Sequence, residues 1–257
     1  MSEQSNDVAI VTGAGSTEGI GMAAARHLGR NGMRVIVTST TGRIHERAAE
    51  LREAGIEASG IVADLTVQRD VDNLVTTATQ TFGAPTVLIN NAGMTSLSSP
   101  DSPASIDEIS VEQWRLSIER NLTTALRMTR AVLPGMRVDG YGRIVNVASI
   151  SGPVMAYTGD VAYHAAKAGM LGLTRASALD VATSGITVNA VAPGWIATSS
   201  SSEHELDMGR ATPVGRSGTP GEVAAAIAFL ASNEASYITG QLIVVDGANS
   251  INEERGL

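Results

Sequence analysis

The stretch that decides the fold is Val8-Ala-Ile-Val-Thr12-Gly13-Ala-Gly-Ser-Thr-Glu-Gly19-Ile-Gly21-Met-Ala-Ala-Ala-Arg-His-Leu28. Its apolar start predicts a strand, its glycine-rich middle a tight turn, and residues 22–28 a helix. A strand, glycine turn and helix in this order present free backbone N–H groups to a pyrophosphate. Because a glycine cluster alone is a weak signal, a turn without a ligand is the alternative.

The alternation of strand and helix continues along the chain. Further strands are expected at 34–38, 59–63, 86–90, 143–148, 185–191 and 241–246, and helices at 43–54, 67–82, 110–136, around Tyr163, and 220–230. Short connections between such elements predict a parallel, doubly wound sheet. Nothing in the sequence marks a linker. We therefore expect an α/β fold in which residues 1–257 form a single Rossmann-type domain, with a seven-stranded parallel sheet and helices on both faces.

Composition limits the partners and the chemistry. The sequence has 257 residues, of which 43% are hydrophobic but only 3% aromatic, so Ala, Val, Ile and Leu must fill the core, as in parallel sheets covered by helices. The net charge of −8 argues against nucleic acid, anionic membranes and acidic proteins as partners.

The residue inventory also bears on location and on metals. Without cysteine, disulfides and thiol nucleophiles are excluded, and a cytoplasmic location is expected. The polar, acidic first residues do not resemble a signal peptide, and no apolar run reaches membrane length. The four histidines show no metal-ligand spacing. We expect surface histidines and no metal site.

Tyr163 and Lys167 indicate a proton-transfer site. They are four residues apart in a helical run, so their side chains leave the same face. A phenol titrates near ~10, and an ammonium group one turn away stabilises its phenolate. Ser149 ends an apolar strand, where side chains of an open α/β sheet meet a ligand. A surface pair is the alternative for a tyrosine and a lysine at this spacing.

Three other stretches have two interpretations each. Residues 94–110 are rich in Ser and Pro and predict a long loop, which is functional or mobile. Asn121 is unfavourable in the middle of a helix and either faces solvent or is kept for its side chain. Residues 199–212 are polar and irregular, and form either a linker or a substrate lid.

Together these motifs resemble the short-chain dehydrogenase/reductase family from about residue 8 to residue 246. The motifs appear in order: the Thr-Gly…Gly-Ile-Gly turn at 12–21, Asp64, Asn90-Asn-Ala-Gly93, Asn121, Ser149, Tyr163-x-x-x-Lys167 and Pro193-Gly194. The resemblance implies a nicotinamide-dependent oxidoreductase that interconverts a ketone and a secondary alcohol. A non-catalytic relative that binds a dinucleotide as a sensor or scaffold is the alternative, because fold does not fix function.

The resemblance also implies residue roles. Tyr163 would exchange a proton with the substrate oxygen, Ser149 would hydrogen-bond that oxygen, Lys167 would lower the phenol's pKa and hold the nicotinamide ribose, and Asn121 would support a proton path through water. Cofactor contacts are expected at Gly13, Gly19, Ile20, Gly21, Thr38, Ser39, Arg43, Asp64, Leu65, Asn90, Ala92, Gly93, Tyr163, Lys167, Pro193, Gly194, Ile196 and Thr198.

The sequence departs from the family pattern in two places. Five residues separate Gly13 from Gly19, where the common pattern has three, and the interval from Ser149 to Tyr163 is one residue longer than usual. The stretch 231–240 is similar to that of 3-oxoacyl-carrier-protein reductases. Residues 138–141 lack the basic cluster with which those enzymes dock an acidic carrier, which weakens the carrier-protein interpretation. The family's edge elements further imply a homotetramer.

The end of the second strand bears on the choice of cofactor. NAD-preferring enzymes usually place a carboxylate there. Here the strand that ends at Thr38 is followed by three hydroxyl-bearing side chains and by Arg43. Residues 37–43 contain no acid. Arg43 suits a phosphate, so NADP(H) is favoured over NAD(H). Glu18, directly before Gly19, opposes this preference unless the longer turn points it away. A solvated Arg43 with no ligand is the alternative.

Overall fold

A sheet of seven parallel strands forms the centre of the protein, whose computed structural model describes residues 7–93 and 103–253. The strands are β1 (Val8–Thr12), β2 (Arg34–Ser39), β3 (Ala58–Val62), β4 (Val87–Asn90), β5 (Gly142–Val147), β6 (Ile186–Pro193) and β7 (Leu242–Val245). Their order across the sheet is β3-β2-β1-β4-β5-β6-β7. The winding direction reverses between β1 and β4, and ligands of open α/β sheets bind at the carboxyl ends of the strands at such a point.

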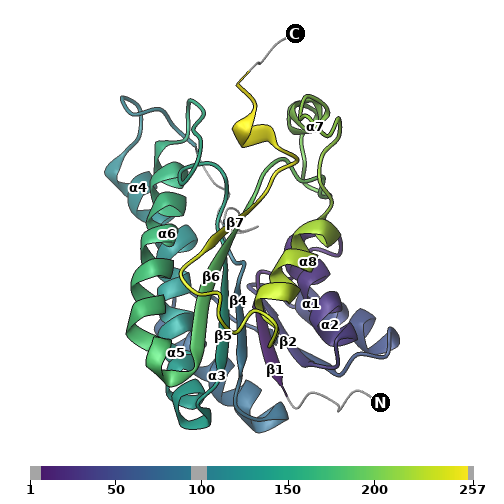
Figure 1. Ribbon diagram of the computed structural model, residues 1–257. Coiled ribbons are helices and arrows are strands. Elements are labelled where there is room, and N and C mark those ends of the chain that lie inside the picture. The colour runs from purple at the N-terminus through teal and green to yellow at the C-terminus, as the bar shows by residue number, and fades with distance from the viewer. Residues whose placement is uncertain (1–6, 94–102, 254–257) are drawn as a thin grey trace.

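Helices cover both faces of the sheet (Figure 1). One layer contains α1 (Ile20–Arg30), α2 (Arg43–Glu53) and α8 (Pro220–Leu230), and the other α3 (Gln68–Phe82), α5 (Thr124–Asp139) and α6 (Val161–Val181). Because successive strand residues face opposite sides, Ala9 and Val11 join the core under α1, α2 and α8, while Val8 and Ile10 join the core under α3, α5 and α6. The predicted doubly wound α/β fold is confirmed.

The expected helix over 110–136 is interrupted at Asn121. The structure has α4 (Val111–Ile118), a π-helical turn (Glu119–Thr123) and then α5. Asn121 lies in the π turn and is fully buried, so the solvent-facing alternative was wrong. Such turns are rare and often occur at functional sites. A capping box between Ser110 and Gln113 starts this region.

The polar stretch 199–212 contains a helix that the sequence interpretation missed. Helix α7 (Glu203–Arg210) begins with a capping box in which Ser202 and Glu205 bond each other's backbone N–H groups. It stands above the carboxyl ends of the strands (Figure 1). The short 3-10 turns Ala182–Ser184 and Asn249–Ile251 complete the elements, while the expected loop at 94–110 lies partly outside the described residues.

Two further findings concern the described part of the chain. None of its helices has the length and hydropathy needed to cross a membrane. Residues 7–93 and 103–253 also contain no group of three or more His, Asp or Glu side chains that could hold a metal ion.

Candidate active site

The side chains of Tyr163 and Lys167 are both buried in the first turns of α6. Tyr163 is 8% exposed and Lys167 4%, so the surface-pair alternative was wrong. The Lys167 Nζ lies 5.6 Å from the centroid of the Tyr163 ring and donates a hydrogen bond to the Val147 carbonyl, 2.9 Å away. Asp160 caps the helix by accepting the Tyr163 N–H at 3.4 Å. The helix start and the end of β5 thus fix this pair.

Burial has a consequence for the charge of Lys167. It lowers the pKa of the ammonium group to about 8, because the charged form loses its hydration. The group is still mostly protonated at neutral pH and can stabilise a nearby phenolate. Lys167 is the only lysine in the sequence, so no other ammonium side chain can substitute for it.

Ser149 lies just beyond the carboxyl end of β5 with its hydroxyl already oriented. Its Oγ accepts a hydrogen bond from the Ser151 N–H at 3.0 Å, which leaves the hydroxyl proton to donate to a ligand. The Ile150 N–H bonds the Pro193 carbonyl at 3.0 Å and so joins this segment to the end of β6. Between Ser149 and Tyr163 the chain makes a tight turn at Gly152, whose φ is +102°.

Asn121 completes the group of four predicted catalytic residues. A Cβ placed on Gly93 would lie 2.8 Å from the Asn121 Oδ1 and 3.7 Å from the Lys167 Nζ. The amide Nδ2 of Asn121 bonds the Ser117 carbonyl at 3.1 Å, so Oδ1 faces the Gly93 backbone. The π turn therefore brings Asn121 to the place where β4 ends, next to Lys167.

The glycine turn is joined to the segment after β4. The Thr12 Oγ1 accepts the Ala92 N–H at 2.9 Å, and the Asn91 side chain donates to the Gly13 carbonyl at 3.0 Å. Gly13 has a φ of +67°, and its Cβ would come within 2.8 Å of the Ala92 Cα. Asn90 turns into the sheet, where its Nδ2 bonds the Asn146 Oδ1 at 2.9 Å. Asn90 therefore joins the ends of β4 and β5 beneath the predicted site.

This turn fits a pyrophosphate. Helix α1 begins after Gly19, which has no capping side chain among the described residues, and its first turn carries no acid. Its first N–H groups and its dipole therefore face the turn, which favours an anion. A Cβ on Gly21 would lie 2.6 Å from the Asn91 Nδ2, and one on Gly15 would lie 3.1 Å from the Ser39 Cβ. Side chains at these positions would crowd the cradle, so the glycines suit a dinucleotide cofactor.

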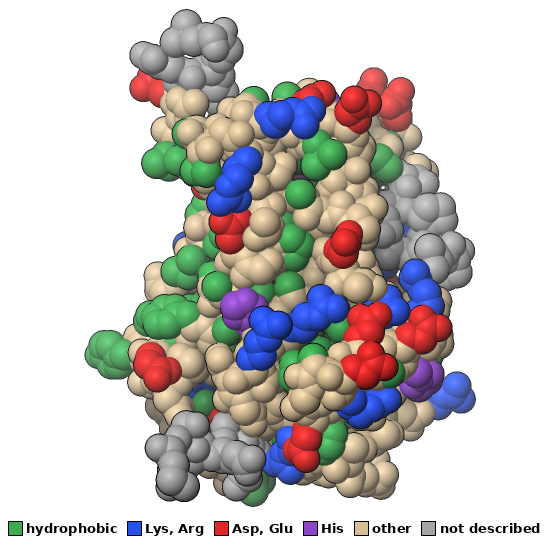
Figure 2. All heavy atoms as spheres, turned by 90° about the vertical axis from the view of Figure 1, so that its right-hand side faces the viewer, with side chains coloured by type: hydrophobic (Ala, Val, Ile, Leu, Met, Phe, Trp, Pro, Cys, Tyr) green, Lys and Arg blue, Asp and Glu red, His purple; other side chains and the backbone are tan. Residues whose placement is uncertain are grey.

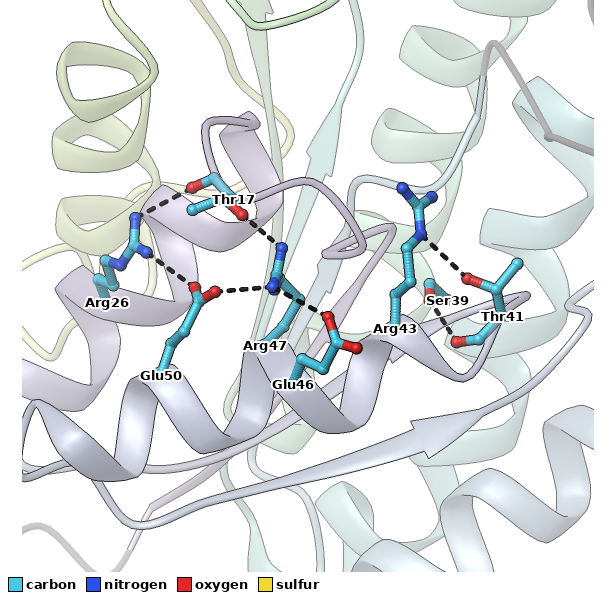
Figure 3. A network of polar contacts seen from close by, with 8 residues as sticks. All are labelled: Thr17, Arg26, Ser39, Thr41, Arg43, Glu46, Arg47 and Glu50. Carbon is cyan, nitrogen blue, oxygen red and sulfur yellow. Dashed lines mark hydrogen bonds and ion pairs between the residues drawn. The ribbon is translucent and has the colours of Figure 1, made fainter.

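Polar side chains follow the end of β2 and lie beside the start of α2 (Figure 3). Thr38 contributes its carbonyl, which accepts the Ala14 N–H at 3.1 Å. The Ser39 hydroxyl donates to the Thr41 carbonyl at 3.2 Å, and the exposed Arg43 donates from Nε to the Thr41 Oγ1 at 3.4 Å. The two terminal nitrogens of Arg43 have no bond drawn to them and point away from α2 (Figure 3). The geometry leaves them available to a ligand.

Asp64 and Leu65 follow β3 at the same edge of the sheet. The Ala63 N–H bonds the Ser39 carbonyl at 3.0 Å, which places Asp64 beside the end of β2. The Asp64 carboxylate accepts from the N–H and hydroxyl of Thr66, at 2.9 and 2.7 Å, and the side chain is exposed. Leu65 is buried under this segment.

The segment after β6 closes the edge on the opposite side. A Cβ on Gly194 would lie 2.7 Å from the Asp246 Cβ, so Gly194 lets this segment cross the end of β7. Ile196 bridges to Gly218, and the Thr198 N–H donates to the Ser201 Oγ at 2.9 Å. The predicted site residues thus follow the carboxyl ends of the strands along one edge of the sheet. Three of them, Thr38, Leu65 and Asn90, are buried beneath this edge.

Sequence reasoning missed a group of side chains around Thr17 (Figure 3). Arg47 of α2 donates to the Thr17 hydroxyl, and Arg26 of α1 donates to the Thr17 carbonyl at 3.0 Å. Arg47 is four residues after Arg43 on the same helix, which is the one signal that could have indicated it. Thr17 is 30 residues away from Arg47 in sequence, and no local pattern reveals that contact.

Comparison with known proteins identifies the family. The family model described as enoyl-(acyl carrier protein) reductase matches residues 13–248. The 3-oxoacyl-acyl-carrier-protein reductase FabG of Vibrio cholerae is 39% identical over 246 residues, which cover 93% of this chain and 96% of the relative. Cis-4-hydroxycyclohexanecarboxylate dehydrogenase of Sinomonas cyclohexanicum is 42% identical, over 93% of this chain and 95% of its own length. The chain belongs to the short-chain dehydrogenase/reductase family.

Solved structures agree with this assignment. A variant of actinorhodin polyketide ketoreductase crystallised with NADPH has a TM-score of 0.88 at 36% identity and covers 98% of this chain and 100% of its own. A short-chain dehydrogenase/reductase from Burkholderia xenovorans has a TM-score of 0.90 at 34% identity, over 98% of this chain and 99% of its own. The protein is therefore an NAD(P)-dependent oxidoreductase of the 3-oxoacyl-reductase type that acts on CH–OH groups, rather than a non-catalytic scaffold.

Proposed function

We propose that the protein is an NADP(H)-dependent ketoreductase in which Tyr163 exchanges the proton, assisted by Ser149, Lys167 and Asn121. One observation carries this proposal. The buried Tyr163–Lys167 pair lies at the carboxyl edge of the sheet, beside an oriented serine hydroxyl and a buried asparagine that meets the backbone at Gly93. A purely structural pair would not require a lone buried ammonium group, which is costly to desolvate.

In the reductive direction the substrate carbonyl oxygen accepts hydrogen bonds from the Ser149 and Tyr163 hydroxyls. When bound, the nicotinamide supplies the hydride to the carbonyl carbon. As charge develops on the oxygen, Tyr163 donates its proton, and the Lys167 ammonium group stabilises the phenolate that remains. Asn121, held by Ser117, supports a water that relays a proton back towards Lys167. The oxidative direction reverses these steps.

The substrate is a small carbonyl or alcohol compound. Relatives of similar identity are named for oxoacyl carriers, for cyclohexanol and for a hydroxycyclohexane carboxylate, so the level of identity does not select among them. Val138 is 87% exposed at the end of α5, in the position where a basic cluster would dock an acidic carrier. This surface and the net charge of −8 favour a free or coenzyme-A-linked substrate over a carrier protein.

The preference for NADP(H) rests on the contrast between Arg43 and Glu18. Arg43 offers two terminal nitrogens at the end of β2, where a 2′-phosphate would lie. Glu18 lies in a groove between α1 and α8 that is also lined by His27 and Pro220. This groove also contains Arg26 and Arg30, whose positive charges offset that of the one acid that would oppose a phosphate.

The test is a panel of ketones, β-keto esters and coenzyme-A thioesters assayed by loss of nicotinamide absorbance with both reduced cofactors. We expect turnover of at least one ketone class, with a higher kcat/KM for NADPH than for NADH. Binding of either cofactor without turnover of any carbonyl or alcohol would contradict the proposed activity. Faster turnover with NADH would contradict the cofactor preference alone.

We further propose that the enzyme is a cytoplasmic homotetramer. The edge strand β7 and helix α8 expose the apolar side chains of Ile243, Val244 and Phe229, and α4 separately exposes Trp114. Two apolar surfaces on different sides suit two two-fold axes. Light scattering at micromolar concentration should give four chains in wild type and fewer in Val244→Asp. Val67→Asp, a substitution at a similarly exposed residue before α3, should remain a tetramer. A monomeric wild type would contradict this proposal.

A further inference from the structure

The glycine turn contains an extension that two helices hold in place. Thr17 lies in this extension, and both of its oxygens are engaged. Its hydroxyl accepts from Arg47 of α2, and its carbonyl accepts from Arg26 of α1 at 3.0 Å. These contacts converge on the turn from two sides (Figure 3). The extension is therefore fixed to the scaffold by side chains outside the turn.

Glu50 closes these contacts into a ring. One of its carboxylate oxygens lies 2.7 Å from the Arg47 Nη2, and the other lies 3.3 Å from the Arg26 Nη2. The side chains of Arg47, Glu50 and Arg26 are 15%, 31% and 33% exposed, so solvent screens these pairs less than fully exposed ones. We call the ring of Thr17, Arg26, Glu50 and Arg47 the turn latch.

Within and beside the turn latch, the charge of Arg47 is paired with carboxylates of its own helix. Besides Glu50, its Nη2 lies 3.4 Å from a Glu46 carboxylate oxygen, and its Nη1 is bonded to Thr17. Arg43, one turn earlier on α2, uses only Nε, for a bond to Thr41. The two arginines therefore have different tasks. Arg47 holds the turn, whereas Arg43 has its terminal nitrogens available to a ligand.

The latch also holds the residue directly before Glu18. With Thr17 held by Arg47, Glu18 lies in the groove lined by His27 and Pro220 between α1 and α8. The first turn of α1, which follows Glu18 and Gly19, contains no acid. If the extension were released, Glu18 could approach the phosphate position near Arg43, where two negative charges would repel each other.

We propose that the turn latch is a cofactor-specificity device, in which Arg47 and Thr17 act as positioning residues that keep Glu18 away from the adenosine ribose. The latch lets a chain with an acid in its glycine turn accept a 2′-phosphate. This inference rests on the proposed preference for NADP(H), and it assigns a function to the turn extension that sets this chain apart from the common pattern.

The test measures dissociation constants of NADPH and NADH by fluorescence titration, without substrate. Arg47→Met should raise the Kd for NADPH by about tenfold and that for NADH by less than about threefold, since like-charge repulsion acts only on the phosphate. Thr17→Val removes one latch bond but keeps the ion pairs, and should shift the ratio of the two Kd values in the same direction. Arg52→Met removes another α2 arginine, bonded to Ala58, and should leave the ratio unchanged.

A double variant separates specificity from mere structure. Arg47→Met combined with Glu18→Gln should regain most of the lost NADPH affinity, because the repelling charge is gone. The proposal would be overturned if Arg47→Met weakened the binding of NADPH and NADH equally. It would also be overturned if the double variant recovered none of the lost NADPH affinity. If wild type instead bound NADH more tightly and Arg43→Ala changed nothing, the NADP(H) preference would fail. The latch would still be judged by whether Arg47→Met changes the Kd ratio.

Discussion

The catalytic end and the adenosine end of the cleft are held in different ways. At the catalytic end the main chain orients the side chains: Val147 accepts from Lys167, and the Ser151 N–H donates to Ser149. At the proposed adenosine end partly buried side chains form ion pairs with each other, such as Glu50 with Arg47. Figure 2 shows this face, where arginine side chains form a band with Asp and Glu beside them. In the proposed mechanism, proton transfer is therefore tied to the main chain of the fold, whereas the proposed cofactor preference depends on side chains outside the buried core.

The largest effect should come from the catalytic end. Tyr163→Phe removes the exchangeable proton and should reduce kcat by at least ~10²-fold, the usual scale for general acid–base catalysis. Tyr157→Phe is the matched control, because its hydroxyl donates to Asp160 at 3.3 Å and has no part in the proposed proton transfer. Steady-state kinetics with the ketone that wild type turns over fastest gives the kcat of both variants. A Tyr163→Phe enzyme within a few-fold of wild type would remove Tyr163 from the mechanism.

A smaller and more selective effect is expected at the adenosine end. Arg43→Ala should lower kcat/KM with NADPH by about tenfold and change that with NADH by less than about threefold, because it removes a charge-assisted contact to the phosphate. Arg69→Ala, at an exposed arginine on α3, serves as the control. An unchanged ratio of the two efficiencies in Arg43→Ala would show that Arg43 is only a solvated residue of the first helical turn.

Burial of Lys167 predicts a smaller effect, on stability rather than rate. Its pKa is about 8 in the folded protein and near ~10.4 in an unfolded chain, so the unfolded state binds more protons between these values. The contribution of Lys167 to the free energy of unfolding therefore rises as the pH increases from 8 to about 10. Thermal midpoints of wild type and Lys167→Met should show a difference that changes across this window. A constant difference would contradict the assigned burial cost.

The smallest effect is expected for an exposed ion pair between α8 and the segment before it. Arg216 lowers the pKa of Glu222 to about 2, mainly through their hydrogen bond. This carboxylate stabilises the fold above its unfolded pKa of about 4.3, and the contribution is lost as the pH falls towards 2. Because the pair is exposed, Glu222→Gln should lower the thermal midpoint only slightly at pH 7. The difference in thermal midpoint between wild type and Glu222→Gln should shrink as the pH falls. A difference that grows on acidification would argue against this ion pair.

The sequence predicted the seven strands and most of the helices because these depend on local patterns, whereas the four candidate catalytic residues came from the family resemblance and stay a prediction. It did not predict the π turn at Asn121, since a shift in backbone hydrogen bonding leaves no mark in composition. Helix α7 was missed although Ser202 and Glu205 have the spacing of a capping box, because low-complexity serines precede it. The contact between Arg47 and Thr17 joins residues 30 positions apart and becomes visible only when α2 packs beside the glycine turn.

The central claim is that Tyr163 transfers the proton at one end of the site, whereas the choice between NADPH and NADH is made at the other end, after β2. The most direct measurement is calorimetric titration of NADPH into Tyr163→Phe, alongside its kcat on the best ketone. The account predicts a Kd within about threefold of wild type and a loss of kcat of at least ~10²-fold. A parallel loss of NADPH affinity and turnover in this variant would contradict it, because Tyr163 would then hold the cofactor rather than transfer the proton.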